Sequence, residues 1–584
     1  MESSNHIKMA ANLPVEGVGR RTLKDGEDKT GMGKIARFFG NPGKRPTVKQ
    51  QAPIVVPEDL VVSDPVIKTF QEERASLYSS SDDSNQEFGT ITVGQNGSIT
   101  TSQGFTGLEK GLTDRILDWL VMAAGSEYVF FLMWCILIIW IVLGCVYKGP
   151  NVWQVVMQDG QSLQTYFWDT LLVRQQLISA HEQRIICGVV RSRIASFKRF
   201  AKERRKFVGL KERDVEVVDL PVGDVEFSSK LLTENWYDRL CNYFSVIIGS
   251  LYTMIIFWIG IIIWLVCGVI PKPGDNEPPY TGETTGSNPH LVKFSSTWQL
   301  YINSATAVVL LVSSMFLQNI RARHDKFIAK FVVQVFDADR EIEEKFRVEC
   351  GDIETENPLA TIPSAKRTTL QKIIDFYADI IGTGAGAFIA VAAIAAWLGV
   401  GKLMDWNDDW WLIIGTYTGL IGFLDGFVIR EVYYRIVNEE ESNYSEVAKE
   451  DLELFESLGI NCPEEYSGKP PTGHMTKLDF RISTWINYVC SSQWSVLLSI
   501  AIIIGLIIGA SCLHWSTTGQ LLANTPTMII EAFFLIVLIQ AHNWADYQRR
   551  VELTALCGRR QILLNHLKNG SSLSQSSVAV SKIQ

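Results

Sequence analysis

Acidic residues occur inside two of the most apolar stretches of the chain. Glu531 lies within MIIEAFFLIVLIQAHNWAD, and Asp425 lies within FLDGFVIRE. A charged side chain in the centre of a bilayer costs about 2.5 to 3.5 kcal/mol on the mildest scale, so these acids predict handling of metal ions or protons. The alternative is an ion pair, because Arg430 follows Asp425 by five residues. Arg174 follows a third candidate, Asp169, by the same interval.

Polar residues also recur at matching positions near the ends of four apolar stretches. In a helical bundle, each matching set would form a ring around the bundle axis. Oxygen and imidazole ligands suit a borderline divalent ion such as iron(II), and also zinc, copper or manganese. The alternative is that these are helix-end residues satisfied by neighbouring backbone and lipid headgroups. The first predicted ring is Gln175, Gln318, Asp425 and Gln540, and the second is His181, His324, Glu431 and Asp546.

The elements that position these residues are predicted from an internal repeat. Gly125, Gly249 and Gly382 each stand fifteen residues before a Trp, and another Gly follows that Trp by four residues. A fourth, degenerate copy begins at Cys490. Each copy reads as an apolar helix, a loop and a second, more polar helix. Two-helix units return to the same side of a membrane, so the four repeats should be parallel and related by rotation, with the polar helices lining the centre.

The predicted fold class is therefore all-α: a polytopic membrane protein of about eight transmembrane helices, long enough to cross a hydrocarbon core of about 30 Å. The second span is polar, and a hydropathy window would reject it. Polar residues are tolerated in a membrane helix that faces a bundle interior. An amphipathic helix is expected over 112–124 and a cytoplasmic helix over 327–348. The predicted spans are 128–147, 153–180, 246–270, 298–325, 380–401, 410–433, 494–513 and 525–544.

The segments between and around the spans complete the predicted organisation. The N-terminal tail is rich in Ser, Asp, Glu, Gly and Pro, a composition typical of disorder. The basic segment after the second span is expected to be cytoplasmic by the positive-inside rule, which places both termini in the cytoplasm. The predicted units are a disordered tail (1–105), repeat 1 with a basic loop (106–235), repeat 2 with a cytoplasmic helix (236–368), repeat 3 with an acidic loop (369–475), repeat 4 (476–567) and a C-terminal tail (568–584).

Composition excludes several other classes of protein. A chain with 47% hydrophobic residues and 17 Trp is too apolar for one ordinary soluble domain. The net charge of -9 argues against a nucleic-acid partner, and the 10 Cys are scattered, as expected for buried hydrophobes. The dispersed His exclude a membrane di-iron oxygenase and a haem reductase, and no P-loop is present. The motif REIEE at 340–344, which matches that of ferric permeases, is interpreted as solvated surface.

Several longer motifs resemble the fungal low-affinity iron(II) permease family. The resemblance runs from about Gly104 to Leu567. It implies a plasma-membrane carrier for iron(II) that also accepts copper and zinc, and it fixes no ligand residue by residue. The motifs are WQVVMQDGQS, PPYTGETTGSNP, QNIRARHD, WWLIIGTYTGLIGFLDGF, STTGQLLANTPTMIIE and QAHNWAD.

The predicted function is low-affinity uptake of iron(II) and related divalent ions, with no enzymatic activity and no permanently bound cofactor. Glu531 would partly dehydrate the ion before it reaches the inner rings, and weak oxygen ligation would let it leave again. The expected partners are the lipid bilayer and the transported ions; a homo-oligomer is left open, and no nucleic acid is expected. The alternative is a non-transporting membrane metal sensor or scaffold, with its signal in the tail and the acidic loop.

Overall fold

Three kinds of helix alternate along the chain, and each kind occurs four times. The computed structural model describes residues 42–43, 45–55, 91–93, 99–101, 104–106, 110–149, 151–208, 229–231, 233, 235–270, 272–273, 284–285, 288–294, 296–352, 354–467 and 478–581. The short helices are α4 (Leu112–Ala124), α7 (Trp236–Ile248), α10 (Thr369–Ile381) and α13 (Leu478–Cys490). The apolar helices are α5 (Glu127–Tyr147), α8 (Leu251–Gly268), α11 (Gly384–Gly401) and α14 (Gln493–Cys512). The long helices are α6 (Asn151–Val208), α9 (Ser296–Cys350), α12 (Asp408–Leu458) and α15 (Thr517–Ser581).

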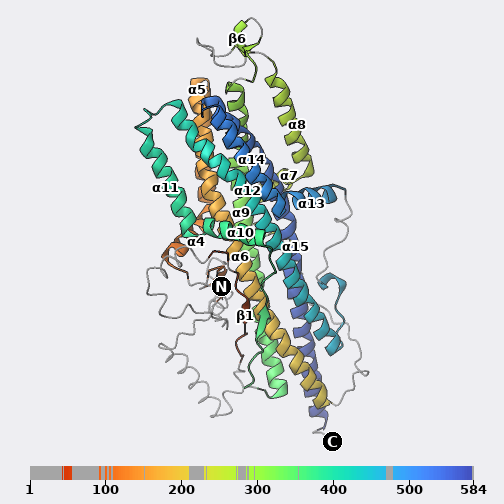
Figure 1. The fold of residues 1–584 in the computed structure, drawn as a ribbon. Coiled ribbons are helices and arrows are strands. Elements are labelled where there is room, and N and C mark those ends of the chain that lie inside the picture. Colours follow the sequence, from red (N-terminus) through yellow and green to blue (C-terminus); the bar gives the residue numbers. More distant parts are fainter. Residues whose placement is uncertain are drawn as a thin grey trace, which may run out of the picture.

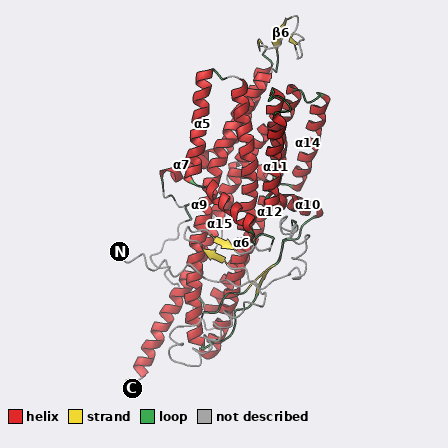
Figure 2. Cartoon of the chain, turned by 90° about the vertical axis from the view of Figure 1, so that its left-hand side faces the viewer, coloured by secondary structure: helices red, strands yellow, loops and turns green. Residues whose placement is uncertain are grey.

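The long helices form the centre of the molecule and the apolar helices surround one half of it (Figure 1). Neighbouring long helices contact one another in the cyclic order α6, α9, α15, α12. All four apolar helices lie in the upper half, and the short helices lie near the level where the apolar helices end (Figures 1 and 2). We call the upper end, where each apolar helix turns into a long one, the hairpin end. The helix order agrees with the predicted repeats, whereas their rotational symmetry stays a prediction.

The pattern of exposure identifies a multi-pass membrane protein. Seven described helices are long and apolar enough to cross a bilayer. The four apolar helices are mostly exposed, whereas α9, α12 and α15 are mostly buried. The predicted second span, 153–180, falls in α6, which is too polar to be among the seven. It packs against α9 and α12 over its length, so its polar residues lie inside the bundle.

The repeated Gly marks a close approach between a turn and a neighbouring long helix. A Cβ on Gly125 would stand 2.8 Å from the Cβ of Ala322 on α9. A Cβ on Gly249 would stand 3.2 Å from the Cα of Gln540 on α15. A Ser follows both glycines and starts the apolar helix by accepting a hydrogen bond from a backbone N–H of its first turn. The Gly pattern therefore fixes how each apolar helix joins the bundle.

The repeated Trp forms a stacked pair across the hairpin end. Trp140 and Trp153 have ring centroids 3.9 Å apart and planes 4° apart. The indole N–H of Trp140 donates to the carbonyl of Trp153 at 3.0 Å, and Trp153 donates back to Trp140 at 2.7 Å. The second Gly of the pattern is required because a side chain on Gly144 would enter the Trp153 ring. The pairs Trp264–Trp298 and Trp397–Trp410 repeat this geometry.

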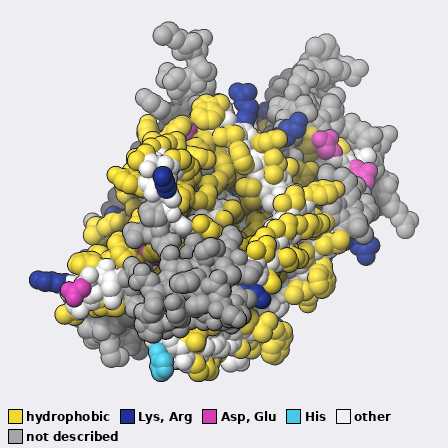
Figure 3. Space-filling model, turned by 90° about the horizontal axis from the view of Figure 1, so that it is seen from above, with side chains coloured by type: hydrophobic (Ala, Val, Ile, Leu, Met, Phe, Trp, Pro, Cys, Tyr) yellow, Lys and Arg dark blue, Asp and Glu magenta, His cyan; other side chains and the backbone are white. Residues whose placement is uncertain are grey.

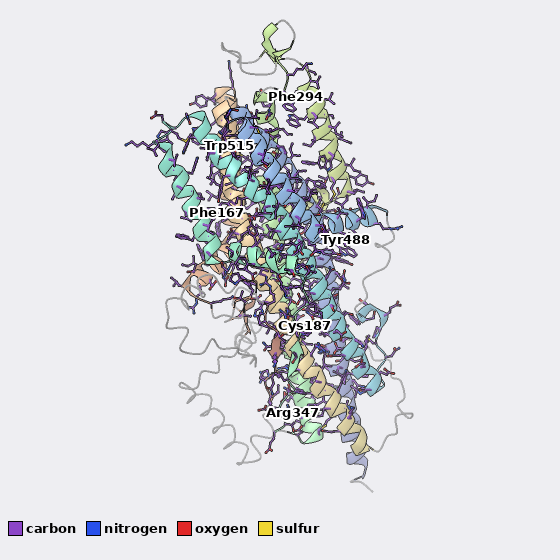
Figure 4. All side chains as sticks on the ribbon, viewed as in Figure 1. Phe167, Cys187, Phe294, Arg347, Tyr488 and Trp515 are labelled. Carbon is purple, nitrogen blue, oxygen red and sulfur yellow. The ribbon has the colours of Figure 1, made fainter. Side chains whose placement is uncertain are left out.

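The long helices continue well beyond the level of the short helices, and this overturns two predictions. The predicted basic loop after 181 is wrong, because α6 is helical to Val208. The predicted acidic loop after 439 is also wrong, because α12 is helical to Leu458. The two charge runs pair with each other and with further partners across the lower bundle, as in Arg191–Glu450 at 2.6 Å. Figure 4 places Cys187 and Arg347 in this lower part.

Glu343 is fully buried in the lower bundle and pairs with Arg347 at 2.8 Å. The interpretation of REIEE as solvated surface is therefore wrong for Glu343 and for the buried Ile342. Arg560 is also fully buried and contacts Asp339 and Asp451 on two other long helices. These pairs sit among apolar side chains such as Phe197 and Leu454, so the lower bundle has its own core.

Part of the predicted disordered tail is an ordered strap along the lower bundle. Residues 1–41 and 56–90 lie outside the described residues. Within 42–55, β1 (Val48–Gln50) pairs antiparallel with β7 (Ala360–Ile362), and Arg45 pairs with Asp379 at 2.5 Å. Composition missed this segment because its partners are far along the chain. The other strands are β2 (Ile91–Val93), β3 (Ile99–Thr101), β4 (Lys272–Pro273), β5 (Thr284–Thr285) and β6 (Asn288–Val292), and a short 3-10 helix, η1, covers Glu464–Tyr466.

We expect Trp153→Phe to lower the thermal stability of the purified protein. Phe keeps an aromatic ring against Trp140 and removes the indole N–H, whose hydrogen bond contributes about 0.5 to 1.5 kcal/mol. The measurement is thermal unfolding in detergent. Trp494→Phe is the control, because Trp494 is 69% exposed on an apolar helix. Equal melting temperatures for the two variants would show that the reciprocal bonds contribute nothing.

Candidate functional site

A small cavity lies between the four long helices in the upper half of the bundle. Its volume is about 50 Å³, enough for one or two water molecules or a partly dehydrated ion. Asp169 of α6, Gln318 of α9 and Glu531 of α15 line it, together with Ser314 and Gly422. Figure 4 labels Phe167, two residues before Asp169, in this upper half. The cavity therefore gathers oxygen-bearing side chains from separate helices.

A stripe of glycines on α12 makes room for these side chains. A Cβ on Gly422 would stand 3.1 Å from the Oε2 atom of Glu531, so the carboxylate lies against the α12 backbone. One turn further, a Cβ on Gly426 would stand 3.4 Å from the Phe534 ring. The sequence pattern of small residues on this helix predicts close helix contact, and the structure confirms it.

Three carboxylates lie close together at this level without a cation. Asp169 interacts electrostatically with Asp425 and Glu531, and Asp425 interacts with Glu531. Asp425 accepts a hydrogen bond of 2.7 Å from the hydroxyl of Tyr377 on α10. Within the described residues, no Lys, Arg or His pairs with any of the three acids. A divalent cation between them would relieve their mutual repulsion.

The two ion pairs that the sequence offered as alternatives are not formed. Arg174 pairs with Asp118 at 2.8 Å and with Asp114 at 3.1 Å, both on α4, and not with Asp169. Arg430 donates to the carbonyl of Phe534 and to the Asn487 side chain, each at 3.0 Å. The arginines instead fasten short helices and α15 to the long helices, which leaves Asp169 and Asp425 free of them.

The structure does not bring the first predicted ring together. Gln318 lines the cavity, and Asp425 lies near its acids. Gln175 instead donates at 2.7 Å to Asp325, in a separate cavity at the side of the bundle. Gln540 lies beside the turn at Gly249. The repeat matched positions along four helices, but which side chains meet also depends on how each helix is rotated.

The second predicted ring is likewise divided. His324 and Asp546 are adjacent, with Nε2 and Oδ1 3.5 Å apart, and they line a lower cavity of about 30 Å³. Arg321 stands 3.3 Å from the same carboxylate and opposes a cation there. His181 is buried elsewhere on α6, and neither of its ring nitrogens has a hydrogen-bond partner among the described residues.

Glu431, the fourth member of that ring, belongs to an ion-pair cluster on the short helix α10. Arg435 pairs with Glu431 and with Asp375 of α10, each at 2.7 Å. Burial would raise the pKa of Asp375, but a hydrogen bond from Arg435 and the charges of Arg435, Arg45 and Arg367 lower it below its usual value. Glu431 therefore supports Arg435, which joins α12 to α10 through Asp375.

No resident metal centre is apparent in the described part of the chain. Its residues include no group of three His, Cys, Asp or Glu side chains placed to hold one ion. The cavity instead combines separated carboxylates with neutral oxygens from Gln318, Ser314 and Thr165, and Arg430, which donates to Phe534 and Asn487, also lines it. Such a set of hard ligands suits a cation that binds weakly and leaves again.

The sequence analysis did not select Asp159 and Asn524, which are both buried in the upper bundle. Asp159 is 4% exposed and Asn524 is 2% exposed. A signal was available in α6, where Gln158, Gln161 and Gln164 follow one another at three-residue intervals. That spacing indicates a polar helix face, and only a helix facing a bundle interior keeps such a face within a membrane.

Comparisons with known proteins agree on one family. The sequence model described as "Low affinity iron permease" matches residues 370–435 and 480–582. The chain is 56% identical over 543 residues to the "Low-affinity Fe(2+) transport protein" of Saccharomyces cerevisiae, covering 92% of this chain and 98% of that protein. It is 39% identical over 468 residues to the "Low-affinity iron/zinc ion transport protein fet4" of Schizosaccharomyces pombe, covering 80% and 75%. No solved structure matches.

We expect Tyr377→Phe to destabilise the protein. The change removes the hydroxyl that donates to Asp425, and a buried acceptor left without its donor costs about 1 to 3 kcal/mol. Thermal unfolding in detergent measures the loss. Tyr128→Phe is the control, because Tyr128 is 86% exposed. If both variants melt with the wild type, Tyr377 does not hold Asp425.

Proposed function

Because the chain belongs to the low-affinity iron permease family, we propose that it imports iron(II) with low affinity and also accepts zinc and copper. Its two relatives are named as iron and iron/zinc transport proteins. The observation that carries the proposal is the central cavity, which Asp169 and Glu531 line from two helices with no ion-pair partner among the described residues, and which Asp425 of a third helix approaches. The chain is a carrier and not an enzyme in this proposal.

The path we propose follows the axis of the long helices. Toward the hairpin end it is closed by an apolar layer, one residue from each long helix: Val155, Leu300, Leu412 and Leu521. The lower lining of the cavity includes Leu172, Leu317, Ile429 and Leu538, again one from each helix, beside Arg430. In this proposal the two apolar layers close the path, so passage requires that one layer opens at a time or that both open briefly.

Weak binding follows from the composition of the cavity. Carboxylates that repel one another attract a divalent ion, while the neutral oxygens replace part of its hydration shell. The described residues include no soft thiolate or paired imidazoles in the cavity that would retain the ion. An ion that enters readily and leaves readily is the requirement for transport at low affinity.

The direction of the path is part of the proposal. The lower bundle carries the basic run of α6, so by the positive-inside rule it is cytoplasmic, together with both termini. The hairpin end then faces outward at the plasma membrane. Seen from that end, the described surface is mostly hydrophobic, with few charged side chains (Figure 3).

We expect Glu531→Gln and Asp169→Asn each to reduce iron(II) uptake at least several-fold while the protein remains folded. Either change removes a negative charge from the cavity and weakens its attraction for the cation. The measurement is uptake of radioactive iron(II) into vesicles reconstituted with purified protein, with zinc and copper as competitors. Glu456→Gln is the control, because Glu456 is an exposed acid on the lower part of α12.

Two results would contradict this proposal in different ways. Full uptake by both cavity variants would show that these two carboxylates are not part of the transport path. If the folded wild-type protein gave no uptake above empty vesicles under any gradient of potential or pH, the sensor or scaffold function would be favoured instead.

We expect Leu412→Ala to raise uptake several-fold at a fixed iron(II) concentration and to weaken discrimination among divalent ions. Removing most of this side chain opens the apolar layer, whose closure we propose to limit entry. The same vesicle assay measures it. Leu498→Ala is the control, because Leu498 is 58% exposed on an apolar helix. Unchanged or reduced uptake by folded Leu412→Ala protein would place the barrier elsewhere.

A further inference from the structure

We infer that a second divalent-cation site lies just below the apolar layer, formed by Asp159 of α6 and Asn524 of α15 against the glycine stripe of α12. This inference rests on the proposed transport of divalent ions, and it adds an outer station to the path before Glu531. Its position follows from sequence spacing on three helices: Asp159 is four residues beyond Val155, Asn524 is three beyond Leu521, and Gly415 is three beyond Leu412. All three residues therefore lie one turn below the layer.

The two side chains meet at one point on α12. A Cβ on Gly415 would stand 3.1 Å from the Oδ1 atom of Asp159 and 3.6 Å from the Nδ2 atom of Asn524. One turn further, a Cβ on Gly419 would stand 2.6 Å from the Oδ1 atom of Asn524 and 3.1 Å from the Oγ1 atom of Thr527. Glycine at these positions leaves the space next to the backbone to polar atoms of α6 and α15.

Three side-chain oxygens at this level have no hydrogen-bond donor among the described residues. The Oδ2 atom of Asp159 and the Oδ1 atom of Asn524 are buried and have no hydrogen-bond partner among the described residues. Gln158, beside Asp159 on α6, donates its side-chain amide N–H groups to the Leu300 carbonyl and the Ser304 hydroxyl, each at 3.4 Å. The Oε1 atom of Gln158 has no hydrogen-bond partner among the described residues. Buried acceptors without donors are satisfied by water, or by a cation with its water shell.

The electrostatics agree with a cation site. Within the described residues, no Lys, Arg or His pairs with Asp159, so no described cation balances its charge. An isolated buried carboxylate is costly, and a divalent ion with oxygen ligands removes that cost. If Asp159 had only a structural role, we would expect it to accept a hydrogen bond from a donor or to pair with an arginine, as Asp118 pairs with Arg174.

The distance between the outer site and the central cavity is suitable for transfer of a cation from one site to the other. Asn524 and Glu531 are seven residues apart on α15, as are Gly415 and Gly422 on α12, which places the two sites about 10 Å apart along the axis. Ions at both sites would repel each other, so arrival of a second ion would favour departure of the first. The outer site would thereby speed release from a cavity that is lined by two acids, Asp169 and Glu531.

The experiment counts bound zinc. Equilibrium dialysis of purified protein in detergent against Zn²⁺ is expected to give two equivalents for the wild type and one for Asp159→Asn. Glu531→Gln is also expected to bind one, and the double variant none. Gly160→Ala is the matched control, because Gly160 adjoins Asp159 and a Cβ there meets nothing within 4 Å. It is expected to bind two.

A charge exchange separates binding from a structural role. Asp159→Asn combined with Asn524→Asp moves the carboxylate across the same site and should restore the second equivalent. Two equivalents bound by folded Asp159→Asn protein, or one equivalent bound by the exchanged protein, would overturn the outer site. The proposed function fails separately, if wild-type vesicles bind zinc but take up neither zinc nor iron(II).

Discussion

The constraint behind this structure is the cost of keeping acids and amides at membrane depth. Four long helices turn these groups toward one another and away from lipid, and four apolar helices surround them on the outside. The polar residues of α6 face protein and not lipid. For this reason α6 can lie within the membrane although it is too polar for a hydropathy criterion to identify it as a span. The proposed interior path and the lipid-facing shell therefore both result from the separation of polar residues inside the bundle from apolar residues outside it.

Two kinds of glycine contact stabilise this arrangement of long and apolar helices. At Gly125 and Gly249, a missing side chain lets the turn between a short and an apolar helix press against a neighbouring long helix. At Gly415 and Gly422, it lets polar side chains of α6 and α15 lie on the α12 backbone. The first kind fixes the shell to the bundle, and the second provides the space in which oxygen atoms converge. The Trp pairs then join shell and bundle at the hairpin end.

The lower bundle is stabilised differently from the upper one. Its helices carry charge runs of opposite sign that meet as ion pairs, including the buried contacts of Arg560 with Asp339 and Asp451. A buried pair is strongly sensitive to loss of one partner, which makes it specific for one register of the four helices. The strap residues 45–55 cross this region and connect it to α10 through Asp379.

The sequence by itself determined the helices and the depth of the polar residues along them. The short helix at 112–124 and the apolar helices follow from local periodicity and hydropathy, and the acids Asp169, Asp425 and Glu531 stand out because each lies in a span. Tertiary structure decided which residues meet. A helix turns by about 100° per residue, so Gln175 and Gln540 at aligned depths point away from Gln318 once their helices are rotated. Charge alone likewise could not separate a solvated loop from the paired helices of the lower bundle, because the partners of α6 lie hundreds of residues away.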